Sequence, residues 1–350
     1  MGGVPRRAGT AAFAHARPLS TVPAAEPSAL VVFGTGALAC AIGARLARGG
    51  ERVTLVGTWT AARDAIARRG VVVHEADETW SARVGTASSD AAAGPVDVVL
   101  VLVKSHRTAG IVPAAARLLS PGGIAVTLQN GLGHRETLEA ALGASRVAVG
   151  VAFLGARLLG PGEVQVVPGR IVLGEEPGGG TRARLLAERL GAAGLEVETT
   201  PDVEGLVWAK LAANCAINPL SALHGVVNGA LLEDPGLRRS LRAAAREVGA
   251  VASARGTLLL GDAADRAEAV ARATASNRSS MLQDVERGAS TEIDALCGAV
   301  VREGTRLGVP TPANDELWRR VRAREGRPVD AEAWPATGRE GRGAAGGERR

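Results

Sequence analysis

Three polar side chains recur at four-residue spacing within one apolar segment of the chain: Lys210, Asn214 and Asn218. Because four residues is close to one helical turn, the three side chains share one face of a helix. A helix that is apolar on its other faces is buried, so its polar face must meet other polar groups or a ligand cleft. Pro219 restricts the residue before it and predicts that this helix ends at Asn218. The residues between the three are all apolar: Leu211, Ala212, Ala213, Cys215, Ala216 and Ile217.

Lysine is rare in this chain, and its two positions are candidates for proton transfer. Of 41 basic residues only Lys104 and Lys210 are lysine, and the others are arginine. Arginine stays charged near neutral pH, whereas a partly buried lysine can release a proton. The chain has no tyrosine, which excludes the tyrosine-based carbonyl protonation of short-chain dehydrogenases and aldo-keto reductases. The alternative for Lys210 is a side chain that reaches solvent, with the two asparagines bonded to backbone groups.

A glycine-rich turn near the N-terminus fits the dinucleotide-binding fingerprint. Its first glycine permits a tight turn, its second lets the backbone approach a pyrophosphate, and its third small residue allows close packing of helix on strand. The free amides at the start of the following helix favour an anion. The motif consists of Gly34, Thr35, Gly36, Ala37, Leu38 and Ala39.

The segment after the second expected strand favours NADP over NAD. An NAD site usually has an acidic residue there to bind the ribose hydroxyls, but residues 53–58 contain no carboxylate. Arg63 follows one helical turn on and is a candidate for the 2′-phosphate, although it is equally compatible with a solvated surface position.

The first part of the chain, which carries the glycine turn, has the sequence pattern of an α/β domain. The apolar run 29–33 leads through the glycine turn into a helical stretch at 37–48, and further apolar runs alternate with helical patterns. Such alternation predicts a parallel sheet covered on both faces. We expect a Rossmann-type dinucleotide-binding domain at 28–200, followed by an all-α C-terminal domain at 201–325. Further strands are expected at 52–56, 71–74, 97–103 and 124–128, and shorter strand-like pieces at 164–167 and 171–173.

The composition limits which binding partners and which cellular compartment we expect for this protein. The two ends, 1–27 and 326–350, read as a disordered extension and a disordered tail, and a targeting peptide is the alternative for the first. They hold three of the five net positive charges, so the body offers no basic face for nucleic acid. The apolar stretch 211–232 contains three asparagines and a proline, which argues against a membrane span. Three separated cysteines favour a reducing compartment, so we expect a cytoplasmic protein.

The combination of motifs resembles the ketopantoate reductase (2-dehydropantoate 2-reductase) family over residues 30–314. Several of the matching stretches are long and follow one another in the family's order. Both lysines fall within them. The stretches are GTGALA at 34–39, VKS at 103–105, QNGLG at 129–133, GA at 155–156, KLAANCAINPLSAL at 210–223 with NG at 228–229, SSMLQD at 279–284, TEID at 291–294 and GVPTPAN at 308–314.

The resemblance implies a reductase that moves a hydride from NADPH to the keto carbon of 2-dehydropantoate and forms pantoate for pantothenate synthesis. Lys210 would be the general acid that protonates the carbonyl oxygen. The substrate's carboxylate and hydroxyl would be bound by Asn214, Asn218, Asn228 and Ser280.

The resemblance also implies cofactor-binding residues outside the glycine turn. Glu292 would lie beside the cofactor ribose and the substrate. Asn130 and Ala156 would line the nicotinamide side, and Lys104 would lie near the adenosine end or in the cleft between the domains. A homodimer is a further expectation.

Three positions depart from the family's usual residues. Thr58 stands where an arginine commonly binds the 2′-phosphate, Arg107 where glutamine is usual, and Cys297 where asparagine often precedes glycine. These departures leave the reaction type intact but permit a different 2-keto acid as substrate.

Two other interpretations remain at this point. One is a β-hydroxyacid dehydrogenase, against which SSMLQD and TEID argue, and the other is a non-catalytic NADP(H)-binding sensor.

Overall fold

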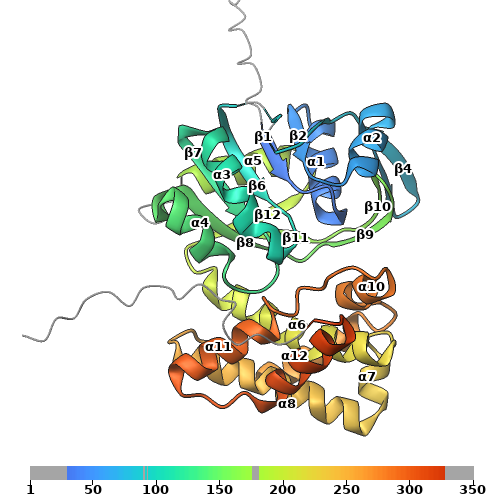
Figure 1. The fold of residues 1–350 in the computed structure, drawn as a ribbon, viewed down its shortest axis with the longest axis vertical. Coiled ribbons are helices and arrows are strands. Elements are labelled where there is room, and N and C mark those ends of the chain that lie inside the picture. The colour runs from blue at the N-terminus through green and yellow to red at the C-terminus, as the bar shows by residue number, and fades with distance from the viewer. Residues whose placement is uncertain (1–29, 90, 93, 176–180, 328–350) are drawn as a thin grey trace, which may run out of the picture.

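The computed structural model describes residues 30–89, 91–92, 94–175 and 181–327. The expected extension 1–27, and all of the expected tail except Gly326 and Arg327, lie outside the described residues. Figure 1 shows two halves: an upper half that contains all the strands, and a lower half built from helices.

An eight-stranded sheet forms the centre of the upper half, in the order β12-β11-β8-β7-β6-β1-β2-β5. All neighbouring strands are parallel except β11 and β8. The α/β fold predicted from the sequence is therefore confirmed. The strands are β1 (Leu30–Phe33), β2 (Val53–Val56), β5 (Gly85–Ala87), β6 (Val96–Val101), β7 (Leu119–Thr127), β8 (Val147–Ala152), β11 (Arg170–Gly174) and β12 (Glu196–Thr200).

Strand β1 is buried on both faces, as expected for a central parallel strand. Leu30 and Val32 belong to the hydrophobic core on one face of the sheet, and Val31 and Phe33 to the core on the other. Because β2 and β6 flank β1 on opposite sides, the chain changes direction across the sheet there. Such a switch point opens a crevice at the carboxyl ends of the strands, where ligands bind. The helices of this half are α1 (Ala37–Arg48), α2 (Thr60–Arg69), α3 (Thr108–Leu118), α4 (His134–Leu142) and α5 (Thr181–Ala192), with short 3₁₀ turns at Ser105–Arg107 and Ala144–Arg146.

A second sheet of four strands lies beside the first, in the order β4-β3-β10-β9. Residues 71–74 form a strand, as predicted, but the expectation that they join the parallel sheet is wrong. They turn back at Ala76, which has a φ of 47°, and pair antiparallel with β4. The reason is that a run of apolar residues specifies an extended conformation but not its partner. The strands are β3 (Val71–Glu75), β4 (Glu78–Ala82), β9 (Gly155–Gly160) and β10 (Glu163–Val167).

The helical half is organised around α6 (Glu204–His224), which packs against α8, α9, α10 and α12. Trp208 and Leu211 of α6 are buried in the core that these helices share. Among the described residues, no helix combines the length and the apolar character that crossing a membrane requires. The other helices are α7 (Ala230–Glu233), α8 (Pro235–Ala254), α9 (Ala263–Ala273), α10 (Ser280–Glu286), α11 (Cys297–Leu307) and α12 (Pro312–Arg324).

The prediction that Pro219 ends this helix at Asn218 is wrong, because α6 continues to His224. Proline lacks the N–H that would bond the carbonyl four residues earlier, which is that of Cys215. The Cys297 thiol lies 3.7 Å from that carbonyl oxygen and donates to it instead. Burial of Pro219 and a replacement donor from α11 therefore allow the helix to continue.

Candidate active site

The glycine turn between β1 and α1 has the backbone that a dinucleotide requires. Gly34 has a φ of +136°, and a Cβ at this position would lie 2.8 Å from the carbonyl oxygen of Leu102. Gly36 precedes α1 without any side-chain cap, and a Cβ there would meet no atom within 4 Å. No side chain therefore caps the first amides of α1, and a pyrophosphate can approach them closely at Gly36.

The other residues of the motif support this turn. Ala39 is fully buried, and Ala37 and Leu38 pack against the same core. Thr35 is buried against Gly57 at the end of β2, where a Cβ would come within 2.8 Å of the threonine side chain. The glycine turn and the start of the β2–α2 connection are thus packed directly on one another.

Arg63, in the first turn of α2, has an arrangement that suits a second anion. Its Nε is buried without a hydrogen-bond partner among the described residues, and its Nη2 donates to Thr60 Oγ1 at 3.4 Å. Thr58, where the family commonly has an arginine, is exposed. A buried guanidinium nitrogen without a partner is costly unless a ligand satisfies it, and a 2′-phosphate has the required charge.

Lys210 extends from α6 toward the strand half rather than into bulk solvent. Its Nζ donates to the carbonyl oxygen of Ala152, the last residue of β8, at 2.6 Å. Burial lowers the pKa of Lys210 to about 8, and the negative charge of Glu292 acts in the opposite direction. The ammonium group is therefore charged at neutral pH but close to the point at which it can release its proton.

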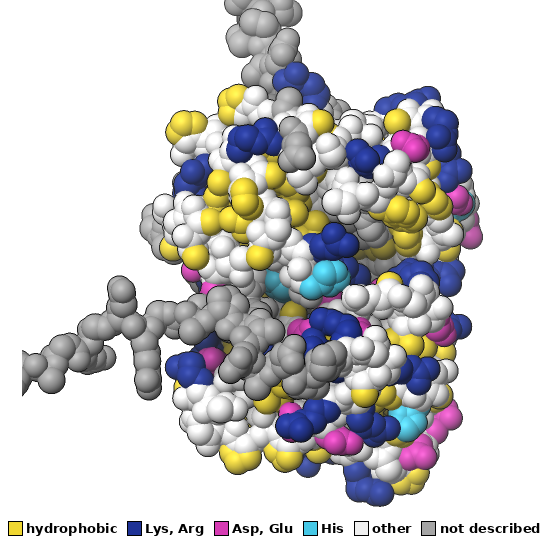
Figure 2. Space-filling view, viewed as in Figure 1, with side chains coloured by type: hydrophobic (Ala, Val, Ile, Leu, Met, Phe, Trp, Pro, Cys, Tyr) yellow, Lys and Arg dark blue, Asp and Glu magenta, His cyan; other side chains and the backbone are white. Residues whose placement is uncertain are grey.

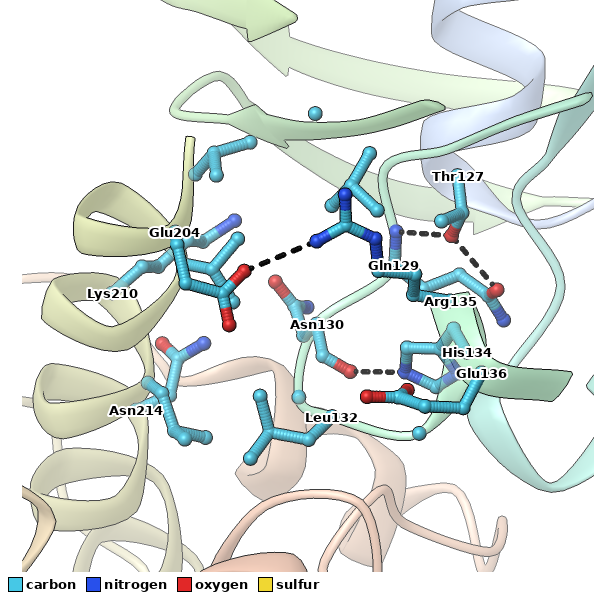
Figure 3. Close-up of a pocket in the computed structure, with 17 residues that line it drawn as sticks. Thr127, Gln129, Asn130, Leu132, His134, Arg135, Glu136, Glu204, Lys210 and Asn214 are labelled. Atoms are coloured by element: carbon cyan, nitrogen blue, oxygen red, sulfur yellow. Dashed lines mark hydrogen bonds and ion pairs between the residues drawn. The ribbon is translucent and has the colours of Figure 1, made fainter. Parts of the chain in front are cut away.

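A pocket of about 580 Å³, counting its open mouth, lies between the two halves and contains Lys210 and Asn214 on one wall. Asn130, from the loop after β7, stands on the opposite wall (Figure 3). Arg135 and Glu204 form an ion pair of 3.3 Å across the same pocket. The structure thus brings together one residue from the strand half and two from α6 that the sequence analysis had selected.

Asn218, Asn228, Ser280 and Ala156 do not line this pocket. Asn218 is buried one turn further along α6. Asn228 donates from Nδ2 to Thr274 Oγ1 at 2.9 Å, and its Oδ1 is buried without a partner. Ser280 is the exposed first residue of α10.

Ser279, rather than Ser280, caps α10, and its hydroxyl accepts from the Leu282 amide at 3.0 Å. Ala156 is half-buried in β9, opposite Val166 of β10.

Lys104 and Glu292 meet where the two halves touch. Lys104 Nζ lies 2.5 Å from Asp284 Oδ2 and 3.9 Å from Glu292 Oε2. Glu292 Oε1 accepts from the Ser105 amide at 3.0 Å. Two carboxylates of the helical half therefore hold the segment that follows β6. Figure 2 shows histidine and basic side chains gathered along the same junction.

Several residues at this junction were not selected from the sequence. Asp284 lies within the SSMLQD stretch at 279–284, but no sequence pattern near it indicates that it pairs with Lys104. Glu204 accepts from Trp208 Nε1 at 3.3 Å and pairs with Arg135, a contact made across 69 residues of sequence.

Among the described residues, no cluster of His, Cys, Asp and Glu side chains is arranged to hold a metal ion.

A Rossmann-type sheet with a glycine turn, joined to a helical half that carries a buried lysine at their junction, defines a nicotinamide-dependent oxidoreductase. Two family models match the chain: ketopantoate reductase PanE/ApbA at residues 30–178, and the C-terminal part of the same family at residues 202–325. The chain belongs to the ketopantoate reductase family.

Individual relatives and solved structures agree with this placement. The 2-dehydropantoate 2-reductase of Halobacterium salinarum is 35% identical over 286 residues, which cover 81% of this chain and 94% of that protein. The enzyme of the same name from Archaeoglobus fulgidus is 37% identical, over 65% of this chain and 76% of its own. A ketopantoate reductase structure from Ralstonia eutropha superposes with a TM-score of 0.79 at 34% identity, covering 85% of this chain and 98% of its own.

A D-mandelate dehydrogenase structure with NADH and anilino(oxo)acetate shares the fold. It has a TM-score of 0.80 at 22% identity and covers 85% of this chain and 98% of its own.

Proposed function

We propose that this protein reduces 2-dehydropantoate to pantoate with NADPH. The observation that carries the proposal is the position of Lys210, whose ammonium group is held at the junction of the halves by the Ala152 carbonyl. The relatives named 2-dehydropantoate 2-reductase, one of which matches over 94% of its length, supply the substrate.

In this reaction Lys210 donates the proton that the carbonyl oxygen needs as its carbon is reduced. Because the pKa of Lys210 is about 8, the group is protonated at neutral pH, and the proton is not held too tightly to transfer. Glu292 stabilises the charged form and keeps the pKa from falling further. The Ala152 carbonyl orients the ammonium group before substrate arrives.

The cofactor would be held by the glycine turn and by α2. The amides after Gly34 and Gly36 would bind the pyrophosphate, and Arg63 the 2′-phosphate. When bound, NADPH would supply the hydride. Asn130, Ala156, Lys104 and Glu292 remain proposed cofactor contacts; of these, Lys104 and Glu292 are already engaged with residues of the opposite half.

Substrate binding is assigned to neutral donors. Asn214, Asn218, Asn228 and Ser280 would bind the carboxylate and hydroxyl of the keto acid. Neutral donors orient an anion without placing a second cation beside Lys210, so its pKa remains set by burial and by Glu292. The buried Oδ1 of Asn228, which has no partner among the described residues, is compatible with a ligand hydroxyl that donates to it.

The domain boundaries, the cellular compartment and the oligomeric state of the protein are proposals as well. We propose a cofactor domain at 28–200 and a catalytic domain at 201–325, which limited proteolysis tests. A cytoplasmic location is supported by three cysteines that are buried and free of disulfides. The homodimer is tested by light scattering during size-exclusion chromatography.

The activity is tested by following NADPH oxidation with purified protein and ketopantoate. Pyruvate, 2-ketoisovalerate and benzoylformate form a comparison panel, and 3-hydroxyisobutyrate with NAD tests the β-hydroxyacid dehydrogenase. Highest kcat/KM with ketopantoate is the expected result. Faster reduction of another 2-keto acid would change the substrate, whereas NADPH binding without turnover of any compound would support the sensor.

A further inference from the structure

His134 is a buried titratable residue on the wall of the pocket between the halves, and the reaction described above gives it no role. It is the first residue of α4, and 6% of its surface is exposed. Its imidazole points back toward the loop that carries Asn130 (Figure 3). The ring therefore lies directly behind a proposed cofactor contact.

The neighbours of the ring determine how its nitrogen atoms bond. Nε2 lies 2.8 Å from the carbonyl oxygen of Asn130, which can only accept, so Nε2 carries a hydrogen and donates it. Nδ1 of the neutral ring has no hydrogen and lies 3.4 Å from Thr108 Oγ1, whose own hydrogen is donated to the Ser105 carbonyl at 2.9 Å. Burial lowers the pKa of His134, against the opposing charges of Glu292 and Glu136, so the ring is neutral at pH 7.

The residue before Asn130 is fixed to the same hydroxyl. Gln129 Nε2 donates to Thr108 Oγ1 at 2.9 Å and to the Val103 carbonyl at 2.7 Å. Gln129 Oε1 accepts from Thr127 Oγ1 at 3.0 Å. Two contacts thus fix Asn130. His134 bonds the Asn130 carbonyl oxygen, and Gln129, the residue before Asn130, donates to the Thr108 hydroxyl. The same hydroxyl oxygen lies beside the His134 ring.

The following residues of the loop, Gly131 and Leu132, pack against the helical half. Leu132 donates its amide to the Ala295 carbonyl at 2.9 Å. Gly131 has a φ of +92°, and a Cβ there would come within 2.3 Å of the same oxygen. The loop therefore has little room on that side, and its position on the strand side depends on Gln129 and His134.

We infer that His134 is a positioning residue, which fixes the Asn130 carbonyl and so orients the Asn130 side chain in the pocket opposite Lys210. The inference rests on the proposed function, because Asn130 acts there on the nicotinamide side. Misplacement of a contacting group by about 1 Å can cost on the order of a hundredfold in rate. We therefore expect a loss in kcat when the imidazole is removed.

The test uses two variants of His134 and a matched control on the same helix. His134→Leu removes both nitrogen atoms, and we expect kcat to fall by at least about tenfold with a smaller change in the KM for the keto acid. His134→Gln keeps an N–H that can reach the Asn130 carbonyl and should recover kcat to within about threefold of wild type. Thr137→Val removes the 2.6 Å bond to the Gly133 carbonyl without touching Asn130, and should leave kcat unchanged.

A double-mutant cycle separates positioning from a general loss of stability. In an Asn130→Ala background, His134→Leu should cause little further loss of kcat, because the side chain that it orients is gone. Equal losses in both backgrounds, or an unchanged kcat in His134→Leu, would overturn the inference. If the wild type turns over no keto acid, the proposed function fails, and the same cycle measured on the Kd for NADPH decides the inference by the same criterion.

Discussion

At the scale of single residues, the chemistry depends on the protonation of Lys210. Its ammonium group is hydrogen bonded to the Ala152 carbonyl at the junction, and burial lowers its pKa to about 8. The hydrogen bond of this group goes to Ala152 and not to the glycine turn, so its removal should leave the contacts of the turn in place. The effects on chemistry and on cofactor binding should therefore separate.

The first prediction is that Lys210→Ala lowers kcat by about 10²- to 10⁴-fold, the usual contribution of a general acid. The Kd for NADPH, measured by quenching of tryptophan fluorescence, should stay within about threefold of wild type, because the glycine turn is untouched. Lys210→Arg is the control that keeps the charge but holds its proton, and it should also be slow. Wild-type turnover in Lys210→Ala would remove this residue from the mechanism.

The second prediction concerns pH. The reduction requires the protonated lysine, so kcat/KM should be level below pH 8 and should fall as the pH rises through the pKa of about 8. Oxidation of pantoate by NADP, which requires the neutral amine, should rise over the same interval. Initial rates in both directions across pH 6 to 10 measure this. A reduction rate that stays constant up to pH 10 would contradict the assignment.

The third prediction is that Arg63→Ala weakens NADPH binding by about ten- to a hundredfold, the value of a charged hydrogen bond, and leaves NADH binding unchanged. Arg63 Nε is buried and has no partner among the described residues, so a phosphate is the group that would satisfy it. Arg68→Ala, in the last turn of the same helix, is the control. Equal losses for both cofactors would show that Arg63 supports the fold instead.

At the scale of elements, helix α6 carries the proton donor and must remain continuous past Pro219. The Cys215 carbonyl that the proline leaves without its helical partner accepts from the Cys297 thiol. A lost donor inside a core leaves a carbonyl unsatisfied. The stability of the helix therefore depends on a residue 82 positions away in the sequence.

The fourth prediction is that Cys297→Ala lowers the free energy of unfolding by about 1–2 kcal/mol, because the carbonyl loses its donor and a small cavity forms. Cys297→Ser keeps a hydroxyl donor and should cost less. Urea denaturation followed by circular dichroism measures both. If the alanine variant is as stable as wild type, the thiol does not support the helix.

At the scale of the whole molecule, the two halves are joined by charged contacts beside the cofactor crevice. Lys104 pairs with Asp284, which is buried and also accepts from Arg287 Nη2 at 2.8 Å, while Glu292 accepts from the Ser105 amide. These contacts hold α10 and Glu292 against the segment that follows β6. Closure of the crevice should therefore depend on this pair.

The fifth prediction is that Lys104→Met raises the KM for both NADPH and the keto acid several-fold, and lowers stability by only about 1 kcal/mol because Arg287 still pairs with Asp284. Asp284→Asn should produce the same change in KM. Small-angle scattering of the free enzyme should show a larger radius of gyration in both variants. Unchanged KM values would mean that the halves are held by other contacts.

Much of the fold followed from local patterns. The strand–turn–helix at 30–48 and the helix that carries Lys210 and Asn214 were predicted correctly, because a fixed rise and turn per residue place neighbours in sequence on one face. The sequence by itself therefore determined the glycine turn, the polar face of α6 and the family.

Only the tertiary structure decided which distant groups meet. It placed residues 71–74 beside β10 in a second sheet, supplied a thiol to the carbonyl that Pro219 frees and joined Lys104 to Asp284. None of these contacts has a local signal, because each partner is chosen by the packing of whole elements. Spacing along one element is fixed by backbone geometry, whereas the pairing of side chains from different elements is fixed only when the two halves bury their surfaces against each other.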